Sequence, residues 1–240
     1  MRNYDFWDGE FYYRISPDKK TVSVSNEFEE QKECYYDSNI IIPSSVVWKS
    51  RAYIITKIDV GAFKGCKDLE SIFIPNSIEE IGEEAFFGCT SLISIDIPES
   101  VKKIGWSAFN GCTALQSVNI PNSVTEIGGE AFKECSSLKS INIPDSIKII
   151  EEGTFWGCKT LMNVNIPDSV IKIETWAFRE CPSLKSINMP DSVKDIGAWA
   201  FDYSPWNSLY YYWEPMKKLE RGESKLYNDN GLDDLEELPF

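Results

Sequence analysis

The side chains that could carry out chemistry in this chain are carboxylates and thiols. Its 240 residues include 38 aspartates and glutamates, seven cysteines and no histidine. The chain therefore lacks the commonest general base and metal ligand, as well as the Ser-His-Asp and Cys-His nucleophile pairs. No two carboxylates are singled out as an acid–base pair, and glycines occur singly at bends, apart from Gly128 and Gly129, with no phosphate-binding loop. We expect no enzyme activity, no catalytic residue and no cofactor.

Six of the seven cysteines recur every 23 residues, at Cys66, Cys89, Cys112, Cys135, Cys158 and Cys181. If segments of that length stack, the thiols form a buried column in which neighbouring Cβ atoms point the same way. This arrangement suits a disulfide poorly. A thiolate metal site is the less favoured alternative, because zinc ligands cluster around a point. We expect free structural thiols and no metal site, with Cys34 standing outside the column.

Other residue types repeat with the same period. Phenylalanine recurs at Phe63, Phe86, Phe109, Phe132, Phe155, Phe178 and Phe201. Leucine and proline follow it, from Leu69 to Leu184 and from Pro75 to Pro190. A fixed period between 20 and 50 residues is typical of a solenoid, in which each unit contacts only its neighbours.

One unit reads L-x-x-I-x-I-P-x-S-I-x-x-I-G-x-x-A-F-x-x-C-x-x. Its first segment predicts a strand that ends at proline, with side chains such as Ile72 and Ile74 pointing inward. A bend at glycine and a second short extended piece follow. Phenylalanine and cysteine, three residues apart, then predict one helical turn. The pattern indicates a β-rich α/β solenoid, whose coils are stabilised by stacking because 23 residues bury too little apolar surface alone.

The segment L-x-x-I-x-I resembles the leucine-rich-repeat strand, and I-P-x-S-[IV]-x-x-I-G-x-x-A-F-x-x-C is similar to the BspA-like branch of that superfamily. The resemblance implies a right-handed coil with one parallel sheet on its concave side and short helical turns. It also implies that residues 40–68 form a widened first repeat with an inserted hairpin. Protein binding, often as a bacterial surface protein or adhesin, is the function it implies.

Three parts of the chain follow from these patterns. Residues 1–39 predict an N-terminal β-hairpin cap, in which Phe6, Trp7, Phe11 and Tyr13 cover the open end of the solenoid. Residues 40–206 form the solenoid, with the widened repeat 40–68 and six regular repeats over 69–206. Residues 207–240 predict an aromatic C-terminal cap and an acidic tail. Within the repeats, Glu151 and Glu174 replace glycine, Thr154 replaces alanine and Met189 replaces isoleucine.

Composition limits the partners. A formal net charge of −14 argues against binding to nucleic acid or anionic lipid, which both require basic patches. The sequence has no apolar run near 18 residues and no export signal, so no membrane insertion is expected. The expected location is cytoplasmic if Met1 is the native start, and the cell surface or outside the cell if a leader has been removed. We expect a monomer.

Two surfaces are candidates for binding. Outward positions of the strands give a polar face that could bind a protein or a glycan, or could simply solubilise the sheet: Ser94, Asp96, Ser117, Asn119, Ser140, Asn142, Asn163, Asn165, Ser186 and Asn188. Four tryptophans at variable positions on the outer side are candidate hot spots, or else pack between turns: Trp106, Trp156, Trp176 and Trp199. The sequence favours a non-enzymatic protein–protein interaction module whose partner it does not identify, and the resemblance implies an adhesin-like role. The alternative is a carbohydrate-binding repeat protein.

Overall fold

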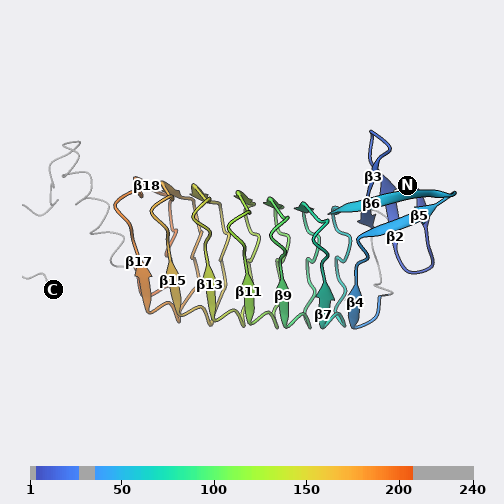
Figure 1. Ribbon diagram of the computed structural model, residues 1–240. Coiled ribbons are helices and arrows are strands. Elements are labelled where there is room, and N and C mark those ends of the chain that lie inside the picture. The colour runs from blue at the N-terminus through green and yellow to red at the C-terminus, as the bar shows by residue number, and fades with distance from the viewer. Residues whose placement is uncertain (1–3, 27–35, 208–240) are drawn as a thin grey trace, which may run out of the picture.

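The coils stack into one elongated row in the computed structural model, which describes residues 4–26 and 36–207 (Figure 1). Each regular coil contributes one three-residue strand to a first ladder and one two-residue strand to a second. The first ladder contains β4 (Asn39–Ile41), β7 (Ser71–Phe73), β9 (Ser94–Asp96), β11 (Ser117–Asn119), β13 (Ser140–Asn142), β15 (Asn163–Asn165) and β17 (Ser186–Asn188). The second contains β8 (Glu80–Ile81), β10 (Lys103–Ile104), β12 (Glu126–Ile127), β14 (Ile149–Ile150), β16 (Lys172–Ile173) and β18 (Asp195–Ile196).

Paired strands run parallel, and from one regular coil to the next each residue pairs with its counterpart 23 positions later. Ser94 pairs with Ser117 in the first ladder, and Lys103 pairs with Glu126 in the second. The expected solenoid is confirmed, whereas the expectation of a single parallel sheet is wrong. The second extended piece of each coil is long enough to pair with its neighbours, so parallel strands form on two sides of the stack.

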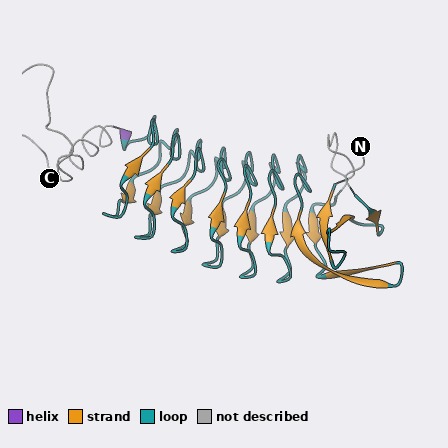
Figure 2. Ribbon diagram, turned by 90° about the horizontal axis from the view of Figure 1, so that it is seen from above, coloured by secondary structure: helices purple, strands orange, loops and turns teal. Residues whose placement is uncertain are grey.

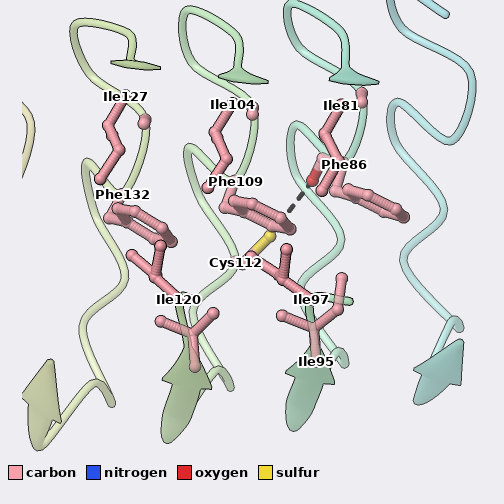
Figure 3. Close-up of a cluster of buried hydrophobic side chains, with 14 of the residues drawn as sticks. Ile81, Phe86, Ile95, Ile97, Ile104, Phe109, Cys112, Ile120, Ile127 and Phe132 are labelled. Atoms are coloured by element: carbon pink, nitrogen blue, oxygen red, sulfur yellow. Dashed lines mark hydrogen bonds between the residues drawn. The ribbon is translucent and has the colours of Figure 1, made fainter. Parts of the chain in front are cut away.

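Phenylalanines form the centre of the core (Figure 3). Between Phe63 and Phe201 each ring lies almost parallel to the next, with centroids 5.2 to 5.8 Å apart. The strand isoleucines point inward as predicted, with Ile72 and Ile74 both buried. Because the offset between coils is constant, every apolar position packs against its own copy, and this repetition makes the core continuous.

Buried cysteines line this core, and their thiols donate hydrogen bonds to the backbone. The Cys112 thiol donates a hydrogen bond to the Phe86 carbonyl oxygen of the preceding coil, at 3.2 Å (Figure 3). Cys89, Cys135, Cys158 and Cys181 repeat the contact at 3.1 to 3.2 Å, and all five are free thiols. Cys66 departs from the prediction of free thiols, because it is disulfide-bonded.

The segment around each phenylalanine is a run of turns, and the predicted helical turn is wrong. Figure 2 shows loops rather than helices along this side of the coils. The amide of Cys112 donates to the Phe109 carbonyl, as in a tight turn, but residues with positive φ stand on both sides of the phenylalanine. In one coil these are Ser107 at 51° and Gly111 at 75°. Left-handed residues interrupt a right-handed helix, so the spacing of phenylalanine and cysteine cannot propagate into one.

An antiparallel N-terminal unit continues the second ladder. It contains β1 (Phe6–Trp7), β2 (Tyr12–Ile15), β3 (Thr21–Ser25), β5 (Ser45–Trp48) and β6 (Arg51–Ile58). β2 and β3 form a hairpin, β3 pairs in parallel with β6, and β6 pairs in parallel with β8. β5 and β6 form an antiparallel hairpin within residues 40–68. Phe6, Phe11 and Tyr13 are buried, whereas Trp7 is exposed.

One junction in the stack lacks strand pairing in both ladders, and we call it the seam. β12 and β14 do not pair, and neither do β11 and β13. β7 and β9 are also unpaired, but at their junction the second ladder is continuous through β8 and β10. Elsewhere the glycine amide after the second strand bonds to the preceding coil, as in Gly128 to the Ile104 carbonyl at 2.9 Å, but the amide of Glu151 has no such bond. The rings of Phe132 and Phe155 are also the most widely spaced of the column, at 5.8 Å.

We attribute the seam to two enlarged side chains of one coil. A Cβ added at Gly128 would lie 2.5 Å from the backbone nitrogen of Trp106, so glycine permits the close approach of coils there. Glu151 occupies the corresponding position, and Thr154, buried, replaces a buried alanine. Both line a small cavity with Ile127 and Phe155. Glu174, whose coil keeps alanine at Ala177, retains its backbone bond to Ile150 at 2.8 Å.

Candidate binding surfaces

The outward side chains of the first ladder form a polar surface, which we call the strand face. All ten residues predicted for it are exposed: Ser94, Asp96, Ser117, Asn119, Ser140, Asn142, Asn163, Asn165, Ser186 and Asn188. Alternation within each short strand produces this face, because the inward residue between each pair belongs to the buried isoleucine and valine column. The strands that carry the two rows lie along one side of the stack (Figure 1).

Side chains of the strand face bond to their counterparts at both ends of the ladder. At the N-terminal end the Ser71 hydroxyl donates to Asn39 Oδ1 at 2.6 Å, and two such contacts occur at the last coils. The Ser186 hydroxyl donates to Asn163 Oδ1 at 2.7 Å, and the Asn188 amide lies 3.4 Å from Asn165 Oδ1. No such bond links Ser94, Ser117 and Ser140, all three of which belong to the described chain. The middle of the face therefore offers donors and acceptors that are available to a ligand.

At its N-terminal end one of the two rows of the strand face is apolar, whereas the other carries Asn39 and Ser71. Ile41 and Phe73 lie opposite each other on β4 and β7, and both are exposed. Sequence reasoning placed Phe73 in the same row as the asparagines but did not single it out. The sequence signal for Phe73 was its place as the one aromatic residue in a row of aspartate and asparagine residues.

A second surface gathers aromatic side chains on the turns of the last coils, and we call it the aromatic ridge: Trp156, Trp176, Trp199 and Tyr203. Ring centroids are 5.7 Å apart between Trp156 and Trp176, and 6.3 Å apart between Trp176 and Trp199. Trp199 is 55% exposed and Tyr203 is 66% exposed, whereas Trp156 and Trp176 are half-buried. The sequence predicted three of these four residues.

Cations already contact part of the ridge. Lys133 Nζ lies 4.1 Å from the centre of the Trp156 ring, and the Arg179 guanidinium lies 5.2 Å from the same ring. Arg179 also lies 5.5 Å from the Tyr203 ring. Its Nε is 3.5 Å from a Glu180 oxygen and 3.7 Å from an Asp202 oxygen. The ridge therefore combines ring faces with both signs of charge.

The fourth predicted tryptophan does not join the ridge. Trp106 is 47% exposed and lies beside Gly129 of the next coil, where an added Cβ would be 3.4 Å from Trp106 Cδ1. Arg179 and Tyr203 were missed by sequence reasoning. Arg179 directly follows a column phenylalanine, at a position whose residue type varies from coil to coil. Tyr203 stands two residues after a column phenylalanine, where the other coils hold glycine or glutamate. Only the aromatic contacts in space reveal their role.

Neither surface has the donor set of a metal centre. Across residues 4–26 and 36–207, no group of three or more His, Cys, Asp or Glu side chains could hold a metal ion. The buried thiols are poor nucleophiles, because burial raises the pKa of the Cys181 thiol to about 12 and also raises the pKa of Cys112 and Cys158. In the described part of the chain no helix has the length and apolar character that crossing a bilayer requires.

Comparison with known sequences assigns the fold to a family. The chain matches the BspA type leucine-rich repeat region, in six copies, over residues 31–162 and 150–219. It belongs to the BspA-type leucine-rich repeat family. The resemblance read from the repeat is thus confirmed. No curated protein shows significant similarity to the chain.

Solved structures of bacterial leucine-rich repeat proteins share this BspA-type fold. A leucine-rich cell surface protein of Faecalibacterium prausnitzii A2-165 is 34% identical, with a TM-score of 0.71, over 82% of this chain and 52% of its own. A leucine-rich repeat protein of Bacteroides ovatus is 33% identical, with a TM-score of 0.67, over 84% of this chain and 57% of its own. This chain spans little more than half the length of those two. The T. pallidum leucine-rich repeat protein is 26% identical, with a TM-score of 0.74, over 92% of this chain and 96% of its own.

Proposed function

We propose that this chain is a non-enzymatic protein-interaction module that acts at the cell surface or outside the cell, and that the aromatic ridge is its main contact. The observation that carries this proposal is the exposure of Trp199 and Tyr203 beside stacked tryptophans. Tryptophan, tyrosine and arginine dominate the binding energy of protein interfaces, and all three types meet here. A contiguous exposed aromatic patch on a folded domain is typical of an interaction site.

Two observations support the location. Cys66 is disulfide-bonded, and disulfides persist in oxidising compartments rather than in the cytosol. The F. prausnitzii protein, 34% identical to this chain, is described as a leucine-rich cell surface protein. The cytoplasmic alternative for a chain that starts at Met1 therefore has the weaker support.

Carbohydrate binding is the second candidate, favoured by one specific feature. The half-exposed ring of Trp199, stacked on Trp176, offers a flat apolar platform with polar side chains beside it, which also suits a sugar ring. A glycan array separates the two functions. Specific binding of one sugar, lost in a Trp199→Ala variant, would replace the protein-binding proposal.

Affinity capture with three forms of the full chain tests the main proposal. The wild type, a ridge variant carrying Trp176→Gly and Trp199→Gly, and a strand-face variant carrying Asn119→Lys and Asn142→Lys are immobilised and exposed to surface proteins of the source cells and their neighbours. We expect one protein to be retained by the wild type and the strand-face variant and lost by the ridge variant. Equal retention by all three forms would exclude the ridge as the contact.

A further inference from the structure

Each coil holds two residues in the left-handed region of φ, one on either side of its column phenylalanine. One stands two residues before the phenylalanine and the other two residues after it. Glycine occupies several of these positions, as at Gly61 (61°), Gly65 (74°) and Gly157 (76°). Glycine is the residue that adopts this backbone without steric cost, so these positions are glycine-type sites by geometry.

Three ridge residues stand at such sites. Trp176, Trp199 and Tyr203 have φ of 59°, 55° and 54°. Bulky side chains in this region are conformational outliers that cost free energy. Other coils place glutamate or serine there, as at Glu84 and Ser107, but large aromatic side chains occur only in the last two described coils.

Packing alone does not account for these aromatic residues. Trp199 and Tyr203 each leave more than half of their surface exposed, so much of the apolar area that could offset the strain stays in water. Strain of this kind clusters at sites that hold a side chain in place for a ligand. The coils thus present two ring faces at fixed positions, with Tyr203 alone already contacted by an internal cation, Arg179.

The surroundings of the ridge indicate the chemistry of the ligand. Residues 174–180 and 195–203 carry four carboxylates and one arginine, in a chain whose net charge is −14. Two of these carboxylates pair with Lys172 and the other two with Arg179, so the carboxylates outnumber the cations that they contact. On the neighbouring ring of Trp156 the protein itself places Lys133 and Arg179. Aromatic faces bordered by carboxylates attract guanidinium and ammonium groups. Among described residues, no cation lies over Trp176 or Trp199 in the same way.

We propose that Trp176, Trp199 and Tyr203 dock a protein segment bearing arginine or lysine side chains. These side chains stack on the rings of Trp176 and Trp199 and interact with Glu180 and Asp202, two carboxylates that share the single cation Arg179. This inference rests on the proposed protein-binding function and adds the place and the chemical class of the partner. It also predicts that binding weakens as ionic strength rises, because part of the attraction is between charges.

Two synthetic peptides test the proposal. One alternates arginine with glycine and serine, and its partner replaces every arginine by citrulline, which keeps the planar shape and removes the charge. Binding to the full chain is followed by tryptophan fluorescence and calorimetry. We expect the arginine peptide to bind, the citrulline peptide to bind at least about tenfold more weakly, and Trp199→Gly to weaken binding of the arginine peptide roughly fivefold to tenfold.

The control variant is Glu84→Gly, at the equivalent glycine-type site of an early coil, which should bind the peptide as the wild type does. Folding is checked through Tm, with glycine and alanine compared at position 199. At a left-handed site Trp199→Gly should unfold roughly 2–4 °C above Trp199→Ala, the reverse of the order at ordinary sites. If the glycine variant had a lower Tm than the alanine variant, position 199 would not be strained and the inference would lose its basis.

Other outcomes overturn the inference without ambiguity. Equal binding of the two peptides, or undiminished binding by Trp199→Gly, would show that the rings do not select cations. Binding of chito-oligosaccharides in place of either peptide would assign the ridge to a glycan. If the arginine peptide fails to bind while the wild type still captures a protein that the ridge variant loses, the protein-binding function stands and only the partner's chemistry is wrong.

Discussion

At the scale of single residues, the protein is stabilised by side chains that meet their own copies. Phe132 illustrates this, since its ring lies between Phe109 at 5.3 Å and Phe155 at 5.8 Å and is fully buried. The neighbouring thiols serve the same column by donating to phenylalanine carbonyl oxygens of the preceding coil. A change at one column position therefore acts on two junctions at once.

Replacing Phe132 by alanine should lower the free energy of unfolding by about 3 to 5 kcal/mol, the usual cost of removing a buried aromatic ring. Phe132→Leu keeps much of the apolar volume and should cost clearly less. Denaturant titration of both variants measures the difference. A loss well under about 1 kcal/mol for the alanine variant would mean that the ring is not part of the core.

The buried thiols predict a loss of stability at high pH. The pKa of Cys181 rises from its usual value of 9.0 to about 12 on folding, because burial disfavours the thiolate. Its contribution is complete below about pH 9 and is lost as pH rises toward 12, since the unfolded chain releases the proton first. The unfolding free energy of the wild type should therefore fall more steeply over this range than that of Cys181→Ser, by at most about 1.4 kcal/mol per pH unit. Equal slopes in the two proteins would contradict the burial of this thiol.

At the scale of elements, the coil is a rigid unit whose fit to its neighbour depends on a few small residues. Gly105 and Gly128 allow the backbone of one coil to approach the next, because an added Cβ at either would lie 2.5 Å from a backbone nitrogen. At the seam, the larger side chains of Glu151 and Thr154 together prevent this close approach. Backbone bonds on the turn side still hold that junction, including the Phe132 amide to the Thr154 carbonyl at 2.9 Å.

The seam should be visible in the hydrogen exchange of single amides. The amides of Lys148 and Glu151 lack the inter-coil bonds that Ile171 and Glu174 make at 2.9 and 2.8 Å. We expect the first pair to exchange at least tenfold faster than the second, because exchange follows local opening. The double variant Glu151→Gly, Thr154→Ala should close the gap and slow exchange at position 151. Unchanged exchange in that variant would place the cause of the seam elsewhere.

The sequence predicted the features that depend on repetition and missed those that depend on backbone angles. A constant period is enough to predict the phenylalanine column and its inward isoleucines, because identical coils must bury identical positions. It is not enough to distinguish a helical turn from a run of tight turns, since Phe109 and Cys112 are three residues apart in both. Positive φ at Ser107 decides the matter. The glycines at the equivalent positions, Gly61 and Gly153, were the available signal.

The seam and the ridge were harder to predict for a related reason. A glutamate in place of glycine affects the stack only through its contacts with the neighbouring coil. In the sequence Glu151 and Glu174 are the same substitution, but their contacts with the neighbouring coils differ. Likewise the spacing of Trp156, Trp176 and Trp199 along the chain does not reveal that their rings meet in space. Contacts between neighbouring coils, rather than the pattern within one coil, determine both features.

At the scale of the whole molecule, a uniform stack presents two different long surfaces. The strand face is regular and polar, and the aromatic ridge is confined to the last coils on the turn side. In a solenoid these surfaces are held rigidly, because each coil is fixed by its neighbours on both sides. A ligand can therefore bind to either surface without rearrangement of the fold, and the two surfaces can be tested separately.

Hydrogen exchange of the chain with and without its captured protein partner tests most directly whether the aromatic ridge is the contact. We predict that the partner slows exchange in residues 174–180 and 195–203, and leaves the strands between Ser94 and Asn165 unchanged. Protection of those strands with an unprotected ridge would contradict the assignment and transfer the binding function to the strand face.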